Sequence, residues 1–223
     1  MTTPRRDFLA WLGGSSLLGL AAGPFARRGD VSAHPAPVDD KWDVSWAERV
    51  EKSRFRAVFD SPEVSEGAAL FRATVWCEEY KSVYGTARAD MAPVIVFRHR
   101  GVALAMGDSY WRRFPIGKEN KLPAEGGKGW LEANPLLAAV TDADASVDQY
   151  NISDFIAQGG IVLACNFAFG EAVERYRKAL KLDAAAARKM ALEALIPGVI
   201  LQPSGVFAVL RAQEAGCRYI LAS

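Results

Sequence analysis

Cys165 is the residue with the clearest potential for covalent chemistry. It ends the apolar run 161–164, which follows a Gly-Gly pair, and this pattern predicts a strand buried on both faces. A helix is expected over 171–182, so Cys165 lies where a strand leads towards a helix N-terminus. Unpaired N–H groups and the positive end of the helix dipole stabilise a thiolate there. We therefore expect Cys165 to act as the nucleophile, and the amide of the adjacent Asn166 to orient a bound group.

Candidates for ligand binding follow two further predicted strands, 93–97 and 199–202. The carboxyl ends of parallel strands meet at one edge of a sheet, where ligands of open α/β folds bind. We therefore expect these candidates to gather with Cys165. One of them, Ser204, is also expected to cap a helix over 206–215. The candidates are Arg98, His99, Pro203, Ser204 and Gly205.

Strand-like and helix-like segments alternate along the chain. The strands are short apolar runs bounded by turn residues, and the helices repeat apolar residues at helical spacing. This alternation predicts an α/β fold with a mostly parallel sheet and helices on both faces. The expected strands are 54–59, 93–97, 161–165, 199–202 and 217–221. The expected helices are 61–84, 102–114, 152–158, 171–182, 184–195 and 206–215.

The N-terminal segment is predicted to be an export signal rather than part of the fold. The pair Arg5-Arg6 precedes a weakly apolar, glycine-broken stretch over 9–22, which resembles a twin-arginine signal cleaved at about 31–33. An uncleaved membrane anchor or a chance Arg pair are the alternatives. We expect a periplasmic protein with no stable membrane span after processing. The expected organisation is a signal peptide over 1–33, a linker over 34–53, and one domain over 54–223. The domain carries an insertion at about 115–151 that is either disordered or works as a lid or packing arm.

Composition narrows the range of functions. The 223 residues suit one domain with a sizeable core, and the formal net charge of +1 gives no support for binding nucleic acid. Three cysteines are an odd number, so at least one thiol is expected to stay unpaired in an oxidising compartment. No Cys-x-x-Cys or Cys/His spacing indicates a metal site, and none is predicted. Cys77, on an apolar helix face, is expected to be a core residue.

Several motifs in the C-terminal third occur together in a characteristic order. They are Ala164-Cys165-Asn166, Leu195-Ile196-Pro197-Gly198-Val199, Gln202-Pro203-Ser204-Gly205-Val206 and the segment 213–220. With the weaker match over 94–101, they resemble the DsrE/DsrF-like sulfur-relay family. The resemblance implies a three-layer α/β/α sandwich that assembles into homo-oligomers, as trimers or hexamers. It also implies that Cys165 accepts sulfur, carries it as a persulfide, and exchanges it with a donor or acceptor protein.

Two other functions fit the same residues. A ligand- or cofactor-binding oligomer without enzymatic activity would use His99 at the sheet edge as an axial ligand or hydrogen-bond donor. Haem would suit that interpretation, because aromatic residues occur nearby in the expected fold. These are Trp111, Trp130, Phe167 and Phe169. A structural subunit would instead use the sheet edge and the helices for oligomer packing, and the sequence alone does not decide between carrier, enzyme and binding protein.

Overall fold

A computed structural model describes residues 41–137 and 151–223. The predicted signal peptide over 1–33 and residues 138–150 of the expected insertion lie outside the described residues. The described residues all belong to one unit, Pro37–Ser223. Within the described ranges, no helix is both long enough and apolar enough to cross a bilayer.

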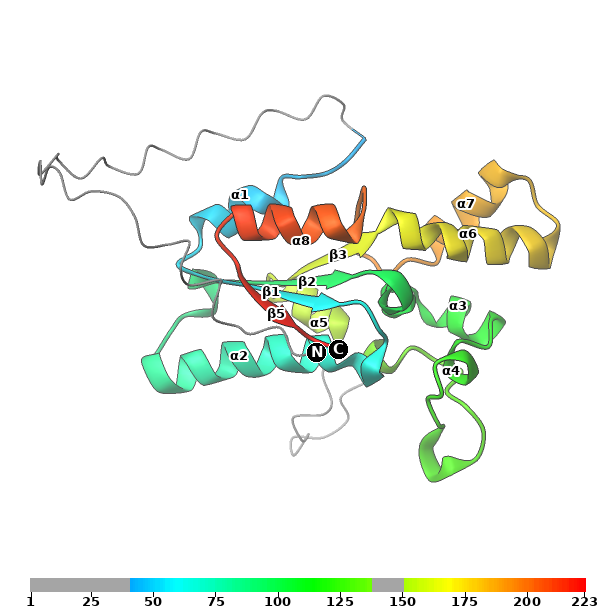
Figure 1. Ribbon diagram of the computed structural model, residues 1–223. Coiled ribbons are helices and arrows are strands. Elements are labelled where there is room, and N and C mark those ends of the chain that lie inside the picture. The colour runs from blue at the N-terminus through cyan, green and yellow to red at the C-terminus, as the bar shows by residue number, and fades with distance from the viewer. Residues whose placement is uncertain (1–40, 138–150) are drawn as a thin grey trace, which may run out of the picture. The chain divides into compact units, whose positions relative to one another are not determined.

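Five strands form one sheet, and every pair of neighbouring strands is parallel. The order across the sheet is β4-β3-β2-β1-β5, which places β3 beside β2 and near the middle. The prediction of a mostly parallel sheet with flanking helices is confirmed. Because the strands are parallel, all five carboxyl ends lie at the same edge (Figure 1). The strands are β1 (Phe55–Ser61), β2 (Met91–Phe97), β3 (Ile161–Cys165), β4 (Ile200–Gln202) and β5 (Arg218–Leu221).

Side chains alternate between the two faces of the sheet, and each face has its own apolar core. Ile95 and Phe97 of β2 pack into one core, while Val94 and Val96 pack into the other. Helices α1 and α8 cover one face and α2 and α5 the other, which gives three layers (Figure 1). These helices are α1 (Trp46–Lys52), α2 (Ala68–Tyr84), α5 (Ile152–Ala157) and α8 (Gly205–Glu214).

Four more helices extend beyond the carboxyl ends of the strands (Figure 1). They are α3 (Asp108–Arg113), α4 (Ile116–Glu119), α6 (Asn166–Leu180) and α7 (Ala184–Glu193). The break between α6 and α7 falls where the sequence predicts it, and Asp183 caps α7 by accepting a hydrogen bond from Ala186 N at 2.8 Å. The side of the molecule that carries these helices is the side where the predicted site residues lie.

The domain begins earlier than the predicted linker over 34–53 implies. Residues Trp46–Lys52 form α1, and Trp46, Ala47 and Val50 are buried in the core beneath α8. Three apolar residues at positions i, i+1 and i+4 give a short helix one buried side. The segment therefore contributes to the fold instead of leading into it.

The helix predicted to start at Ser61 starts later. Ser61 is buried and pairs with Phe97 at the end of β1, so sheet pairing overrides its preference for a helix N-cap. A one-turn 3₁₀ helix over Ser65–Gly67 then intervenes, and its Glu66 has a φ of 55°. Helix α2 begins only after Gly67.

The first part of the expected insertion packs against the domain. Leu122 and Leu136 are buried in the core, and Asn134 is buried with them. The Asn134 side-chain amide donates to the carbonyls of Leu104 at 2.9 Å and Met106 at 2.7 Å. The described part of the insertion, up to residue 137, is therefore tied to the fold by buried hydrogen bonds.

Candidate functional site

Cys165 occupies the junction between β3 and α6. All five residues of β3 are buried, and α6 begins at Asn166, directly after the cysteine. The thiol is the N-cap of α6, and its Sγ accepts a hydrogen bond from Ala168 N at 3.4 Å. The helix therefore starts five residues earlier than predicted, and the sulfur lies directly at its N-terminus, where one N–H of the first turn points at it.

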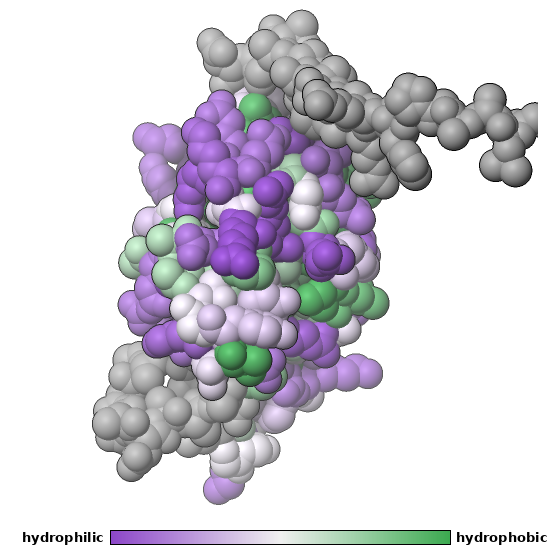
Figure 2. All heavy atoms as spheres, turned by 90° about the vertical axis from the view of Figure 1, so that its left-hand side faces the viewer, coloured by the Kyte–Doolittle hydropathy of each residue, from purple (hydrophilic) through white to green (hydrophobic). Residues whose placement is uncertain are grey.

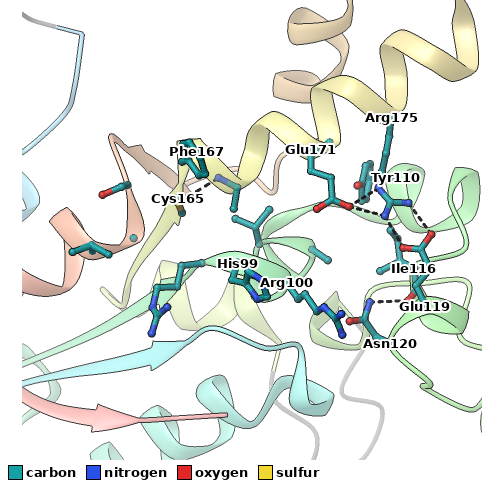
Figure 3. Close-up of a pocket in the computed structure, with 18 residues that line it drawn as sticks. His99, Arg100, Tyr110, Ile116, Glu119, Asn120, Cys165, Phe167, Glu171 and Arg175 are labelled. Carbon is teal, nitrogen blue, oxygen red and sulfur yellow. Dashed lines mark hydrogen bonds and ion pairs between the residues drawn. The ribbon is translucent and has the colours of Figure 1, made fainter.

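A pocket of about 760 Å³ opens at this edge of the sheet (Figure 3). Although only 6% of Cys165 is exposed, it lines this pocket. Of the residues that the sequence singles out, Arg98, His99, Cys165, Ser204 and Gly205 all line it. The expectation that these residues gather at one edge is therefore met by the geometry, although they lie far apart in sequence.

Arg98 is held in place by a buried carboxylate. Its Nε and Nη2 donate to the two carboxylate oxygens of Asp60 at 2.7 and 2.9 Å. Asp60, at 2% exposure, also accepts a hydrogen bond from the Tyr219 hydroxyl at 2.9 Å. The hydrogen bond to Asp60 raises the pKa of the Arg98 guanidinium. A Cβ at Gly205 would overlap the Arg98 side chain, so α8 packs closely against it.

His99 lies at the mouth of the pocket. Its backbone is left-handed, with a φ of 49°, and its side chain is 64% exposed. Its Nδ1 lies 3.2 Å from Oε1 of Glu63. Among the residues that the structure describes, no three His, Cys, Asp or Glu side chains gather closely enough to hold a metal ion.

The Pro-Ser-Gly corner follows β4. The Ser204 hydroxyl accepts a hydrogen bond from Phe207 N at 3.1 Å, which confirms that Ser204 caps α8. Gly205 contributes to the pocket wall, whereas Pro203 is not among the lining residues. Helices α6 and α8 follow neighbouring strands, so both N-termini face the same pocket.

Asn166 is turned away from the pocket, in contrast to the expected role. Its Oδ1 accepts a hydrogen bond from Arg188 Nη2 at 2.8 Å, which ties the start of α6 to α7. It is not among the residues that line the pocket. Its observed contact is therefore a helix-to-helix link, whereas the neighbouring Cys165 faces the cavity.

The far end of the pocket carries an ion-pair cluster that the sequence analysis missed. Arg175 binds both carboxylate oxygens of Glu119, at 3.0 and 2.6 Å, and Oε1 of Glu171 at 2.8 Å. Tyr110 also lines this end, and burial raises the pKa of its hydroxyl. The i, i+4 spacing of Glu171 and Arg175 is visible in the sequence. The participation of Glu119 is not, because it comes from the expected insertion.

The other two thiols lie away from the pocket. Cys77 is on α2 and Cys217 directly precedes β5, and both are buried and free. Burial raises the pKa of Cys77 to about 11 and that of Cys217 to about 12. Both therefore stay protonated at neutral pH, and neither has a cavity of its own among the pockets described.

The fold and the site together define a class: a three-layer α/β/α protein with an all-parallel sheet and a thiol in a pocket at its carboxyl edge. Neither a protein-family model nor a curated protein matches the chain. A solved structure to which the chain is similar is a protein of unknown function, MTH1491, from Methanobacterium thermoautotrophicum. The two are 18% identical, the match covers 75% of this chain and 98% of that one, and the TM-score is 0.38. A likeness of this size does not bear on function.

Proposed function

We propose that this protein is a periplasmic, DsrE-like sulfur carrier in which Cys165 accepts a sulfane sulfur and holds it as a persulfide. The observation that carries the proposal is the position of the sulfur. Cys165 Sγ accepts an N–H hydrogen bond at the start of α6 and lines a pocket of about 760 Å³. A nucleophilic thiol needs both a stabilised anionic form and access for a reagent.

The charge distribution around the pocket suits an anionic reagent or ligand. Positive dipole ends of α6 and α8 face the cavity, and Arg98 lines it from the end of β2. Because Asp60 neutralises much of the Arg98 charge, Arg98 serves mainly as a fixed hydrogen-bond donor. The resemblance of Ala164-Cys165-Asn166 to the sulfur-relay motif points to the same residue.

The transfer step is a thiol–persulfide exchange. The Cys165 thiolate attacks the outer sulfur of a donor persulfide, RS–SH, and a new S–S bond forms as the donor S–S bond breaks. The donor leaves as RS⁻ with the bonding electron pair, and Cys165 becomes Cys–S–SH. One sulfur atom moves, no external oxidant is consumed, and the reverse reaction delivers the sulfur to an acceptor thiol.

The test is intact-mass spectrometry of the reduced protein after exposure to inorganic polysulfide. We expect a gain of about 32 Da for each added sulfur atom, mapped to Cys165 by peptide analysis. The variant Cys165→Ser should show no gain, whereas the matched double variant Cys77→Ala/Cys217→Ala should load normally. An unmodified Cys165, in protein whose thiol is shown to be reduced, would refute the proposal.

The proposal also includes export and assembly. The resemblance to a twin-arginine signal and to a family of trimers and hexamers supports an exported homo-oligomer. Sequencing the N-terminus of protein recovered from the periplasm tests the first part, and sedimentation of that protein tests the second. A protein that stays in the cytoplasm with its N-terminus uncleaved would refute the export part of the proposal. A protein that sediments as a monomer would refute the assembly part.

A further inference from the structure

The pocket is much larger than a single sulfur atom requires. Its volume of about 760 Å³ falls within the range of about 300–1,000 Å³ that is typical of sites for small organic ligands. A site that only received a protein cysteine would need access to Sγ and no such volume. On the basis of the proposed function, we propose that the pocket binds a short peptide thiol, two or three residues long, as the carrier of the sulfur. The peptide would bear both an ammonium and a carboxylate group.

One wall of the pocket offers an acceptor for the ammonium group. Glu119 and Glu171 both bind the single guanidinium of Arg175, so the cluster has one more carboxylate than cation. Both hydrogen bonds from Arg175 to Glu171 end on Oε1, which leaves Oε2 to face a ligand. A ligand ammonium would complete the charge balance of the cluster.

The opposite wall offers donors for a carboxylate. In Figure 3, Glu171 and Arg175 project from α6, whereas His99 and Arg100 come from the segment that follows β2. Arg100 makes no ion pair with any residue of the described ranges, so its charge is available to a ligand. Arg98 uses Nε and Nη2 on Asp60, and its Nη1 can also donate.

The distance along α6 sets the size of the ligand. Glu171 lies six positions after Cys165, which corresponds to about 9 Å along the axis of a helix. A single amino acid spans only about 3.5 Å, whereas two or three residues reach about 7–10 Å. A dipeptide or tripeptide thiol can therefore place its sulfur at Cys165 and its ammonium at Glu171. Its carboxylate would then lie towards Arg100.

The experiment compares two donors on the same protein. Glutathione persulfide carries both charged groups, and inorganic polysulfide carries neither an ammonium nor a carboxylate. The rate at which Cys165 gains sulfur is measured by intact mass for each donor. We expect Glu171→Gln and Arg100→Gln each to slow loading from glutathione persulfide about fivefold. Polysulfide is an anion, so Glu171→Gln should not slow its loading, and Arg100→Gln should slow it less than it slows loading from glutathione persulfide.

The control variant is Glu174→Gln on the same helix. Glu174 binds Arg177 and Lys178 and does not line the pocket, so its loss should change neither rate. N-acetylglutathione persulfide, which lacks the ammonium, should react with wild-type protein about as slowly as glutathione persulfide reacts with Glu171→Gln.

Failure of this inference and failure of the proposed function give different results. If polysulfide loads Cys165 but the pocket variants do not discriminate between the donors, the peptide-thiol inference is overturned and the sulfur carrier stands. Equal slowing with both donors also overturns it, because the variants would then act on Cys165 itself. If neither donor loads wild-type Cys165, the proposed function fails.

Discussion

Cys165 and Cys217 are buried to nearly the same extent, at 6% and 7% exposure, yet they lie in opposite environments. Cys165 is the last residue of β3, and Cys217 directly precedes β5. Because the sheet is parallel, the first thiol lies at the carboxyl edge and the second at the amino edge. Exposure alone therefore does not describe the difference between the two thiols.

The helices account for the difference. Cys165 starts α6 and accepts a hydrogen bond from Ala168 N, whereas Cys217 follows the carboxyl end of α8. The negative end of a helix dipole disfavours a thiolate, and burial raises the pKa of Cys217 to about 12. The direction of the strands thus places the two cysteines in opposite environments at the two edges of the sheet.

The amino edge of the sheet also has a pocket lined by basic side chains, but no thiol lies in it. On this face, hydrophilic side chains gather in the upper part of the described surface, above a paler region with small hydrophobic patches (Figure 2). A smaller pocket of about 280 Å³ lies at this edge and includes Arg49, Lys52 and Arg88, but no cysteine. The carboxyl edge is distinguished by two helix N-termini and a thiol that meet in one cavity.

The sharpest test of this comparison is selective alkylation. Under native conditions, iodoacetamide should modify Cys165 on the order of 100-fold faster than Cys217, because only Cys165 faces a cavity and a helix N-terminus. Peptide mapping over time measures both rates. In denaturant the two rates should converge, and native modification of Cys217 at the rate of Cys165 would contradict the comparison.

The second test is the dependence of stability on pH. The pKa of Cys217 is raised from 9.0 to about 12, and that of Cys77 to about 11, so above pH 9 the unfolded chain loses protons that the folded protein keeps. The free energy of unfolding therefore falls as the pH rises. At pH 10.5 each of the two thiols should account for a loss of about 2 kcal/mol.

Urea denaturation at pH 8 and pH 10.5 measures this loss. Lysines and tyrosines titrate over the same range, so the informative quantity is the difference between wild type and Cys77→Ala/Cys217→Ala. That variant should lose about 4 kcal/mol less than wild type between the two pH values. Equal losses in the two proteins would show that the buried thiols do not stay protonated.

The features of the site that the sequence predicts are those fixed by the backbone. Arg98, Cys165 and Ser204 each follow an apolar run, and parallel pairing brings the ends of such runs to one edge. The side-chain direction of Asn166 could not be predicted in the same way, because it depends on Arg188 of another helix. A motif indicates which residue follows a strand but not where its side chain points.

Residues that act through tertiary contacts were missed for the same reason. Asp60 directly follows the predicted strand over 54–59, and nothing in the sequence around it indicates that it anchors Arg98 and binds Tyr219 from the last strand. Glu119 lies in a stretch whose composition is typical of a loop. Neither partnership has a local sequence signal, because the partners are 38 or more residues apart.

The third test removes the anchor of Arg98. Asp60→Asn leaves the guanidinium without its buried counter-charge, and we expect the free energy of unfolding to fall by about 2–3 kcal/mol. Glu51→Gln is the matched control, because Glu51 pairs with Arg211 at 2.7 Å on the opposite face. The Glu51 side chain is 44% exposed, against 3% for Asp60, so that pair should contribute less than about 1 kcal/mol.

Asp60→Asn should also slow sulfur loading of Cys165, since Arg98 would no longer be held at the pocket. Glu51→Gln should leave loading unchanged. If Asp60→Asn lowers stability but leaves the loading rate unchanged, the Asp60–Arg98 pair stabilises the fold only. Arg98 would then have no part in the proposed sulfur loading of Cys165.

The smallest expected effect is at the far end of the pocket. Glu119→Gln removes the bidentate partner of Arg175, but Glu171 remains within 2.8 Å and the site is partly exposed. The free energy of unfolding should therefore fall by only about 0.5 kcal/mol. Alkylation of Cys165 by neutral iodoacetamide should be unchanged, because the thiol is held by β3 and α6 and not by this cluster. An altered alkylation rate would mean that the ion-pair cluster and the thiol are coupled, and that the two ends of the pocket do not act independently.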